Sequence, residues 1–353
     1  MLDTCGGGAD PTLTFLATLY ASVRYSSLAP STLRKHVPSW TRFTTWLAAR
    51  SPPFAPLAVP GCIVALYLLQ VREESARDSI GPSRVLEASA AIACQYLLMG
   101  LPSPTSHPTC TVVREAAVRT LHARHVARDE LTVTDIRLLV EVFCTPATSS
   151  LMDLMHGTIL LLMFAACLRF DEAAEIAVDS DFMVFCPGYV LLFIAKSKTD
   201  QRMTGRWIPV LQVDGPYCPV MWLQALLHRG AYVRNRPEPN FDCGPLLRAV
   251  LRQGSSHRLK RLCGTRANPV PSLSASRLSE RCTEMCRAVG IDRHITLHSC
   301  RGGAASTAAD AGVSTFMLRH LGGWRSDTMP NLYAKTDLLA MLHVRRSLGL
   351  GDT

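Results

Sequence analysis

The sequence predicts a mainly α protein with a small antiparallel β-sheet, built as two domains. Apolar residues recur at helical spacing through most of the chain, and one stretch near residues 183–210 is rich in β-branched and aromatic residues. The length of 353 residues indicates two domains, because a domain holds about 150 residues. With 48% hydrophobic and 18% charged residues, the chain has ample apolar surface to bury, which excludes a disordered tail protein.

The first 126 residues are predicted to be helical. Residues 1–10 are small and glycine-rich, so we expect a flexible N-terminus, and a helical pattern begins at Leu13. Pro30 begins another helix, which Ser51-Pro52-Pro53 ends. The apolar residues that share one face of this helix are Val37, Trp40, Phe43, Trp46 and Leu47. Further helices are expected near residues 63–70, 82–99 and 112–125, with a proline-rich break at residues 102–108.

The second predicted domain begins at residue 130. A helix follows the polar start at residues 131–135, and a strongly apolar helix is expected over residues 150–169. Its longest uncharged run has 12 residues, whereas a membrane span needs about 20, so we expect a buried helix and no membrane-spanning segment. Residues 183–194 and 206–210 are predicted as antiparallel strands around a polar turn at residues 196–200. Residues 234–271 are predicted to be irregular, and the remainder helical.

The charge of the chain indicates a polyanionic partner. Lysine and arginine number 37 and aspartate and glutamate 28, so the net charge is +9, which suits nucleic acid or an acidic membrane surface. Residues 229–293 contain 13 basic and 5 acidic residues. This stretch is either a solvated surface or a face that follows DNA phosphates, and the sequence leaves both interpretations open.

The cysteines point to reduced thiols. There are 13 of them, without a CxxC pair, and the N-terminal residues have neither the basic nor the apolar segment of a secretory signal. We therefore expect an intracellular protein with buried free cysteines rather than a disulfide framework.

Two short segments in the first half of the second domain hold side chains suited to phosphate chemistry. Arg169 follows the apolar helix, so it is expected to be half-buried and to need a partner, which Glu172 three residues later supplies. The polar turn at residues 196–200 offers Lys196 or Lys198 as a proton donor at a hairpin tip. Taken alone, the first segment is explained equally well by an ordinary ion pair within a helix, and the second by a turn exposed to solvent.

Two further segments lie near the C-terminal end. His298 and Arg301 are three residues apart and share a helical face, and the small residues after Arg301 allow another backbone to approach closely. A Gly-Gly turn then positions Trp324, and Tyr333 follows nine residues later. His294 lies four residues before His298, but no third ligand has a supporting position, so no metal site is expected.

In combination these side chains are suited to one reaction, the attack of a nucleophile on a phosphate group. The arginines, the histidine, the lysine and the indole N–H all donate to phosphate oxygens, and the tyrosine hydroxyl is a nucleophile. In order and spacing they resemble the tyrosine recombinase, or phage integrase, family of DNA breaking and rejoining enzymes. The residues that carry the resemblance are Arg169 with Glu172, Lys198, His298, Arg301, Trp324 and Tyr333.

The resemblance covers about residues 130–345 and implies a domain organisation. Residues 130–349 would be the α+β catalytic domain. Residues 11–126 look like the family's helical core-binding (SAM-like) domain that clamps DNA, although they carry much weaker motifs. Lys196 is the rival of Lys198 for the family's hairpin lysine, and the Lys198-Thr199 dipeptide is the more similar of the two.

The family's reaction gives each residue an expected role. Arg169 and Arg301 would clamp the non-bridging phosphate oxygens, Trp324 would donate to one of them, and Glu172 would orient Arg169. Tyr333 would attack the phosphate with help from His298, and Lys198 would protonate the departing 5′ oxygen. The resemblance implies a 3′-phosphotyrosyl intermediate and neither cofactor nor metal.

The expected function is therefore site-specific DNA recombination or integration, as in a mobile element, with double-stranded DNA as the partner. The amphipathic segment 336–348 would dock on a neighbouring subunit in a homotetramer, or pack on its own domain. In a eukaryotic host we expect the nucleus, and otherwise the cytoplasm. Two alternatives remain, a type IB topoisomerase-like enzyme and a degenerate integrase that only binds DNA.

Overall fold

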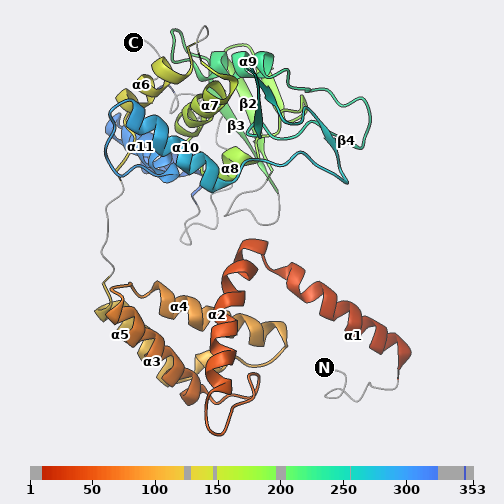
Figure 1. Ribbon diagram of the computed structural model, residues 1–353, viewed down its shortest axis with the longest axis vertical. Helices are drawn as coiled ribbons and strands as arrows, with labels where there is room; N and C mark the ends of the chain where they lie inside the picture. Colours follow the sequence, from red (N-terminus) through yellow and green to blue (C-terminus); the bar gives the residue numbers. More distant parts are fainter. Residues whose placement is uncertain are drawn as a thin grey trace. The chain divides into compact units, whose positions relative to one another are not determined.

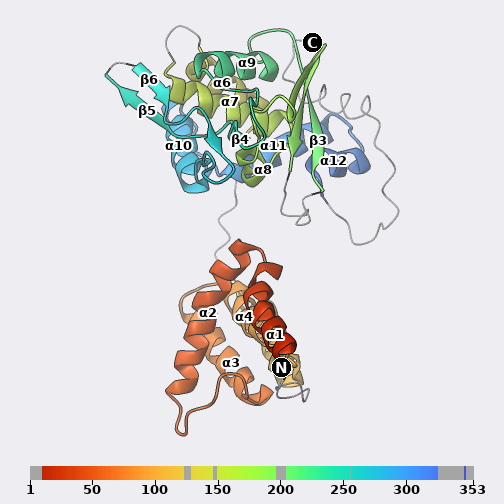
Figure 2. The same cartoon turned by 90° about the vertical axis from the view of Figure 1, so that its right-hand side faces the viewer.

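The structure is mainly helical and also contains small antiparallel sheets, which confirms the predicted fold class. The computed structural model describes residues 10–122, 129–145, 149–195, 204–254, 256–324 and 346. The chain divides into two compact units, Met1–Val126 and Ala127–Thr353, which Figures 1 and 2 show from two sides. No helix among the described residues is long and apolar enough to cross a membrane.

Every regular element in the described part of the first unit is a helix. Its elements are α1 (Pro11–Val23), the 3₁₀ turn η1 (Arg24–Ser27), α2 (Pro30–Ala48), α3 (Gly61–Arg77), α4 (Ser83–Leu98), the 3₁₀ turn η2 (Pro104–Ser106) and α5 (Pro108–Thr120). Helix α2 packs on α4, and α3 packs on both α4 and α5. Phe43 and Leu47 of α2 enter the core, whereas Val37 is 53% exposed, so the apolar face is not buried along its whole length.

Helix α5 begins earlier than the sequence suggested. Pro108 was expected to break the chain, but it is the first residue of α5, where its missing N–H costs no hydrogen bond. His107 caps this helix, because its Nδ1 accepts a hydrogen bond from the N–H of Thr109 at 3.4 Å. The helix ends at Thr120, where Leu121 is extended, so the predicted end near residue 125 is wrong.

The second unit combines helices with short strands. Its helices are α6 (Val133–Phe143), α7 (Leu151–Ala165), α8 (Phe170–Ala174), α9 (Pro219–Arg229), α10 (Ala275–Ala288), α11 (Leu297–Asp310) and α12 (Thr315–Gly322). Its strands are β1 (Met183–Cys186), β2 (Tyr189–Ile194), β3 (Arg206–Leu211), β4 (Phe241–Asp242), β5 (Val250–Gln253), β6 (Ser256–Leu259) and β7 (Gly264–Thr265).

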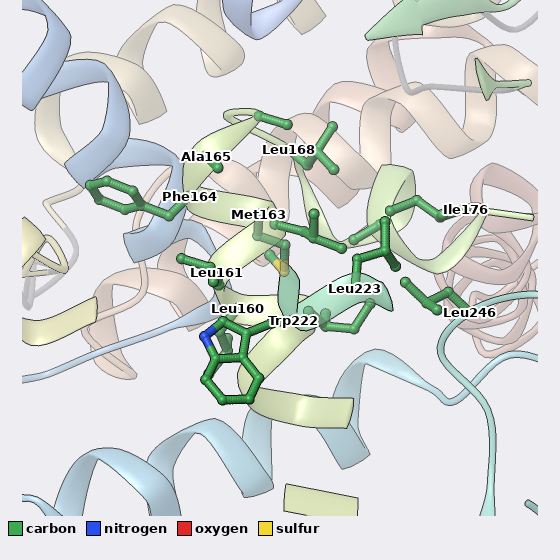
Figure 3. Packing of buried hydrophobic residues seen from close by; sticks show 14 of the residues in the cluster. Leu160, Leu161, Met163, Phe164, Ala165, Leu168, Ile176, Trp222, Leu223 and Leu246 are labelled. Atoms are coloured by element: carbon green, nitrogen blue, oxygen red, sulfur yellow. The ribbon is translucent and has the colours of Figure 1, made fainter. Parts of the chain in front are cut away.

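Helix α7 forms the centre of the second unit. Every residue from Leu154 to Ala165 is buried, and α6, α9, α10 and α11 pack around the helix. Figure 3 shows leucine and methionine side chains of this helix beside Trp222 and Leu223 of α9, whereas the ring of Phe164 points away from them. The sequence predicted this central position from an apolar surface that continues all round the helix.

The main sheet has three antiparallel strands in the order β1-β2-β3. The apolar run that the sequence assigned to one strand is a hairpin, because Gly188 at φ 79° turns the chain between β1 and β2. Strand β3 pairs with β2 in the register Ile194 to Arg206, so the hairpin expected around residues 196–200 is confirmed at its base. The turn itself lies outside the described residues.

Residues 234–271 are more ordered than predicted. They contain two small antiparallel pairs, β4 with β7 and β5 with β6. The guanidinium of Arg248, 1% exposed, donates to the carbonyl oxygens of Cys243, Pro245, Arg261 and Leu262, which organises this stretch around one buried side chain. The cysteines among the described residues are free, and most are buried.

Candidate functional site

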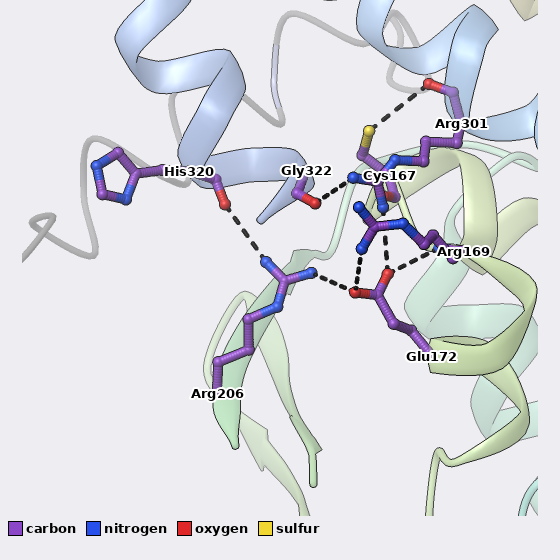
Figure 4. A network of polar contacts seen from close by, with 7 residues as sticks. All are labelled: Cys167, Arg169, Glu172, Arg206, Arg301, His320 and Gly322. Carbon is purple, nitrogen blue, oxygen red and sulfur yellow. Dashed lines mark hydrogen bonds and ion pairs between the residues drawn. The ribbon is translucent and has the colours of Figure 1, made fainter. Parts of the chain in front are cut away.

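A buried carboxylate, Glu172, lies at the centre of an arginine network in the second unit (Figure 4). Its Oε1 accepts hydrogen bonds from Nη1 of Arg169 at 3.2 Å and from Nη2 of Arg206 at 3.4 Å. Its Oε2 accepts from Nη1 of Arg301 at 3.3 Å and from the backbone N–H of Arg169 at 2.8 Å. Because the Glu172 side chain is 0% exposed, these donors replace water around its charge.

Arg169 reaches this network because helix α7 ends before it. Helix α7 ends at Ala165, and Cys167 adopts the left-handed region at φ 51°, so the prediction that the apolar helix runs to residue 169 is wrong. Arg169 is instead the extended N-cap of α8, and Glu172 in the first turn bonds back to its N–H. The predicted ion pair of Arg169 with Glu172 is confirmed, although a helix cap and not a continuous helix brings the two together.

Arg301 enters the network from α11 and is 4% exposed. Its Nη1 also donates to the carbonyl oxygen of Cys167 at 3.3 Å, and its Nη2 donates to the carbonyl oxygen of Gly322. The thiol of Cys167 in turn contacts the carbonyl oxygen of Arg301 at 3.6 Å. Burial lowers the pKa of Arg301 to about 10, and the neighbouring guanidinium groups of Arg169 and Arg206 act in the same direction.

Trp324 lies against Arg301. Helix α12 ends at Gly323, whose φ of 60° requires the left-handed region that glycine adopts at no steric cost. The next residue, Trp324, places its ring 4.4 Å from Cζ of Arg301 in a cation–π contact and stays 36% exposed. The predicted Gly-Gly turn therefore brings the tryptophan to the arginine from the end of α12.

Arg206 is a member of the network that sequence reasoning missed. It is the first residue of β3, its side chain is 26% exposed, and its Nη1 donates to the carbonyl oxygen of His320 at 3.4 Å. The available signal was an arginine at the edge of a β-branched run, next to the hairpin that carries the candidate lysines. Such an arginine is most often a solvated strand end, so the pattern alone does not select it.

The remaining predicted residues divide into two groups. His298 lies in the first turn of α11, on the same helix as Arg301 as predicted, and is exposed. Lys196, Lys198 and Tyr333 lie outside the described residues, as does the segment 336–348 apart from Arg346. The described residues contain no group of three side chains suited to hold a metal ion.

A close helix contact holds α11 in place. A Cβ on Gly303 would lie 1.8 Å from the carbonyl oxygen of Leu131, so only glycine allows this approach, as the run of small residues predicted. Just before α11, Arg293 donates to Oδ2 of Asp135 at 2.5 Å, and the N–H of His294 donates to Asp129 at 3.0 Å, so the same segment 129–135 is contacted again. These contacts anchor the helix that carries His298 and Arg301.

The network has an excess of positive charge. Three guanidinium groups share one carboxylate, Glu172, which raises the pKa of both Arg301 and Arg206. Unpaired cationic charge in a partly buried place is costly, and an anion with several oxygens would offset that cost. The arrangement is therefore suited to bind a phosphate group through arginine donors.

A relative of known name resembles the chain along most of its length. An integrase/recombinase xerD homolog of Selenomonas ruminantium is 22% identical over 313 residues, which cover 87% of this chain and 82% of that protein. A match of this extent includes residues of both units. No family model matches the chain.

Two solved structures are also similar. A lambda integrase dimer bound to a COC′ core site has a TM-score of 0.48 and 16% identity, and the match covers 99% of this chain and 84% of that one. The Tn1549 transposon integrase in complex with circular intermediate DNA has a TM-score of 0.48 and 13% identity, with 92% and 97% of the two chains covered.

Proposed function

We propose that this chain, a member of the tyrosine recombinase family, cuts and rejoins DNA at specific sites through a covalent link to Tyr333. The observation that supports this most is that Arg169 and Arg301, from separate elements, both pair with buried Glu172, and that Trp324 packs on Arg301. These side chains occur in the order and spacing of the family motif. The similarity to the xerD homolog supports recombination over a topoisomerase-like reaction.

The arginines would activate the scissile phosphate. In-line attack adds negative charge to the non-bridging oxygens, and Arg169 and Arg301 would bind these oxygens as paired N–H donors. Glu172 holds both guanidinium groups in one place before DNA arrives. Trp324 would shield the phosphate and donate its indole N–H. Removal of one such donor is expected to slow cleavage by about 10²- to 10³-fold.

Proton transfer would fall to three further side chains. A tyrosine hydroxyl in water has a pKa near 10, so attack by Tyr333 at neutral pH would need a group that receives its proton or stabilises its anion. His298 is proposed for that role, with a hydrogen bond to the phosphate as the alternative. Lys198 would protonate the 5′ oxygen as it leaves. The 3′-phosphotyrosyl bond conserves the energy of the broken bond, so rejoining to another strand requires no nucleotide.

The first unit is proposed to clamp double-stranded DNA. Helix α2 and the residue after its C-cap expose Arg34, Lys35, Arg42 and Arg50, and residues 30–50 contain no acidic side chain. Arg34, Lys35 and Arg42 also line a hollow of about 440 Å³ beside α4. Such a surface attracts the DNA backbone without sequence preference. Site preference would then come from further contacts in the grooves.

Assembly is proposed to occur on DNA. Segment 336–348 would dock on a neighbouring subunit and give a homotetramer that holds two duplexes. Sedimentation of the full chain with and without its DNA site tests this, with a variant that lacks residues 336–348 as the comparison. A variant that still forms the same assembly would show that the segment packs on its own subunit.

The decisive experiment begins with the target site, which covalent capture identifies. DNA that is bound covalently to the chain in cells is purified, and its trapped ends are sequenced. A nicked duplex carrying the recovered site then serves as a suicide substrate. The chain should form an adduct that denaturant does not release, and Tyr333→Phe should bind the same DNA without forming it. An adduct that survives Tyr333→Phe would refute the proposed nucleophile.

A further inference from the structure

We infer that Arg206 is a positioning residue of this site, which holds the end of α12, and with it Trp324, to the Glu172–Arg301 pair. This inference rests on the proposed function only for its effect on catalysis. The structural coupling is a property of the described residues and stands by itself.

Arg206 bridges two elements with one guanidinium group. Its Nη2 donates to Glu172 at 3.4 Å, and its Nη1 donates to the carbonyl oxygen of His320 in the last turn of α12 at 3.4 Å (Figure 4). Arg301 makes the parallel connection, from Glu172 to the carbonyl oxygen of Gly322. Two arginines from different elements therefore fasten the same helix end to the same carboxylate.

The helix end is shaped to receive Arg206. A Cβ on Gly323 would lie 2.9 Å from Cζ of Arg206, so the guanidinium packs directly on the glycine backbone. The negative end of the helix dipole and its last carbonyl groups favour a cation at this position. Trp324 is the next residue, so its position depends on how firmly this helix end is held.

The base of the hairpin is equally constrained. Gly205 adopts φ 69°, and a Cβ there would lie 2.2 Å from Cζ of Phe193. Arg206 pairs with Ile194 at the end of β2, and Trp207 packs on Phe193 with ring centroids 5.1 Å apart. The backbone of Arg206 is therefore held in one position by the sheet. Its side chain fixes the end of α12 relative to that sheet.

The role depends on the guanidinium fork and not on charge alone. A lysine ammonium in place of Arg206 keeps the charge but lacks the planar pair of nitrogens that reaches Glu172 and His320 together. Arg206→Lys should therefore behave like Arg206→Met. A residue that only supplied positive charge to the phosphate would be replaced well by lysine.

The test uses the full chain labelled with 5-fluorotryptophan. The chain has five tryptophans, whose ¹⁹F resonances are assigned by single Trp→Phe changes. In Arg206→Met and Arg206→Lys the Trp324 resonance should shift or broaden, while that of Trp222, buried in the core, stays in place. The matched control is Arg137→Met, which removes a half-buried arginine 5.0 Å from the Tyr217 ring and should leave the Trp324 resonance unchanged.

The second readout is the rate of adduct formation on the suicide substrate. Both Arg206 variants should form the adduct at least tenfold more slowly at unchanged affinity for DNA, and Arg137→Met at the rate of the unmodified chain. An unshifted Trp324 resonance in Arg206→Met, or a normal rate in Arg206→Lys, would overturn the inference. If the unmodified chain forms no adduct, the proposed function fails, and the fluorine spectra still decide the coupling.

Discussion

At the residue scale, one carboxylate organises the candidate site. Glu172 accepts hydrogen bonds from three guanidinium groups that come from α8, β3 and α11. Residue spacing suggested only the contact with Arg169, because that partner is three positions away. The contacts with Arg206 and Arg301 depend on the fold, so a local pattern in the sequence carries no signal for them.

Glu172→Gln should therefore destabilise the second unit strongly. The amide removes the one negative charge beside three partly buried cations, and breaking a buried ion pair costs about 3–5 kcal/mol. Urea unfolding of the full chain measures this change in the free energy of unfolding. Glu175→Gln is the matched control, because Glu175 is exposed three residues later. Equal stabilities for the two variants would contradict the central role of Glu172.

Asp135 should make the stability of the second unit depend on pH in the acid range. Burial raises the pKa of this carboxyl, but hydrogen bonds from Arg293 and Thr132 outweigh it, so the pKa is lowered in the fold. A lowered pKa stabilises the fold above the unfolded value of about 3.9, and this contribution disappears as pH falls through the folded pKa.

Asp135→Asn should thus cost about 1–2 kcal/mol at pH 7, because it also weakens the cap that joins Thr132 to α6. The difference from the unmodified chain should shrink as the pH falls below about 4. Urea unfolding at several pH values measures it. Asp292→Asn, at an exposed position, is the control and should show neither effect. A difference that stays constant with pH would refute the ion pair.

At the element scale, the points where helices and strands end decide how the site residues are placed, and these points were harder to predict than the elements themselves. The apolar pattern predicted α7 and its central position, but it could not show that the chain leaves the helix at Cys167. That break turns Arg169 toward Glu172. The strands in residues 234–271 were missed for a related reason, because the buried guanidinium of Arg248 organises them through carbonyl contacts that have no period in the sequence.

Adjacent glycines in α11 provide a test of this packing. Gly303→Ala should destabilise the chain by about 1–3 kcal/mol, because its Cβ would collide with the backbone of Leu131. Gly302→Ala should be neutral or stabilising, because its Cβ would meet only the flexible side chain of Glu130 at 3.3 Å and alanine favours helix. Thermal unfolding of the two variants compares them. Equal losses would show that α11 does not pack as described.

At the scale of the whole molecule, the sequence predicted a mainly α chain with a small sheet, and the fold confirms it. It also selected Arg169, Glu172, Arg301 and Trp324, which the fold brings together. Arg206 was missed because its partners lie on α8 and α12, far from it in the chain. The motif of the resembling family selected Arg301 and Trp324 although they lie on other elements than Glu172, but it has no position for Arg206.

The most direct test of the proposed reaction is to identify the amino acid that carries the DNA. The trapped adduct is digested with protease and nuclease, and the modified peptide is sequenced by mass spectrometry. We predict that the peptide contains Tyr333 and carries a nucleotide through its 3′ phosphate. A nucleotide on another side chain, or one joined through its 5′ phosphate, would contradict the proposed mechanism.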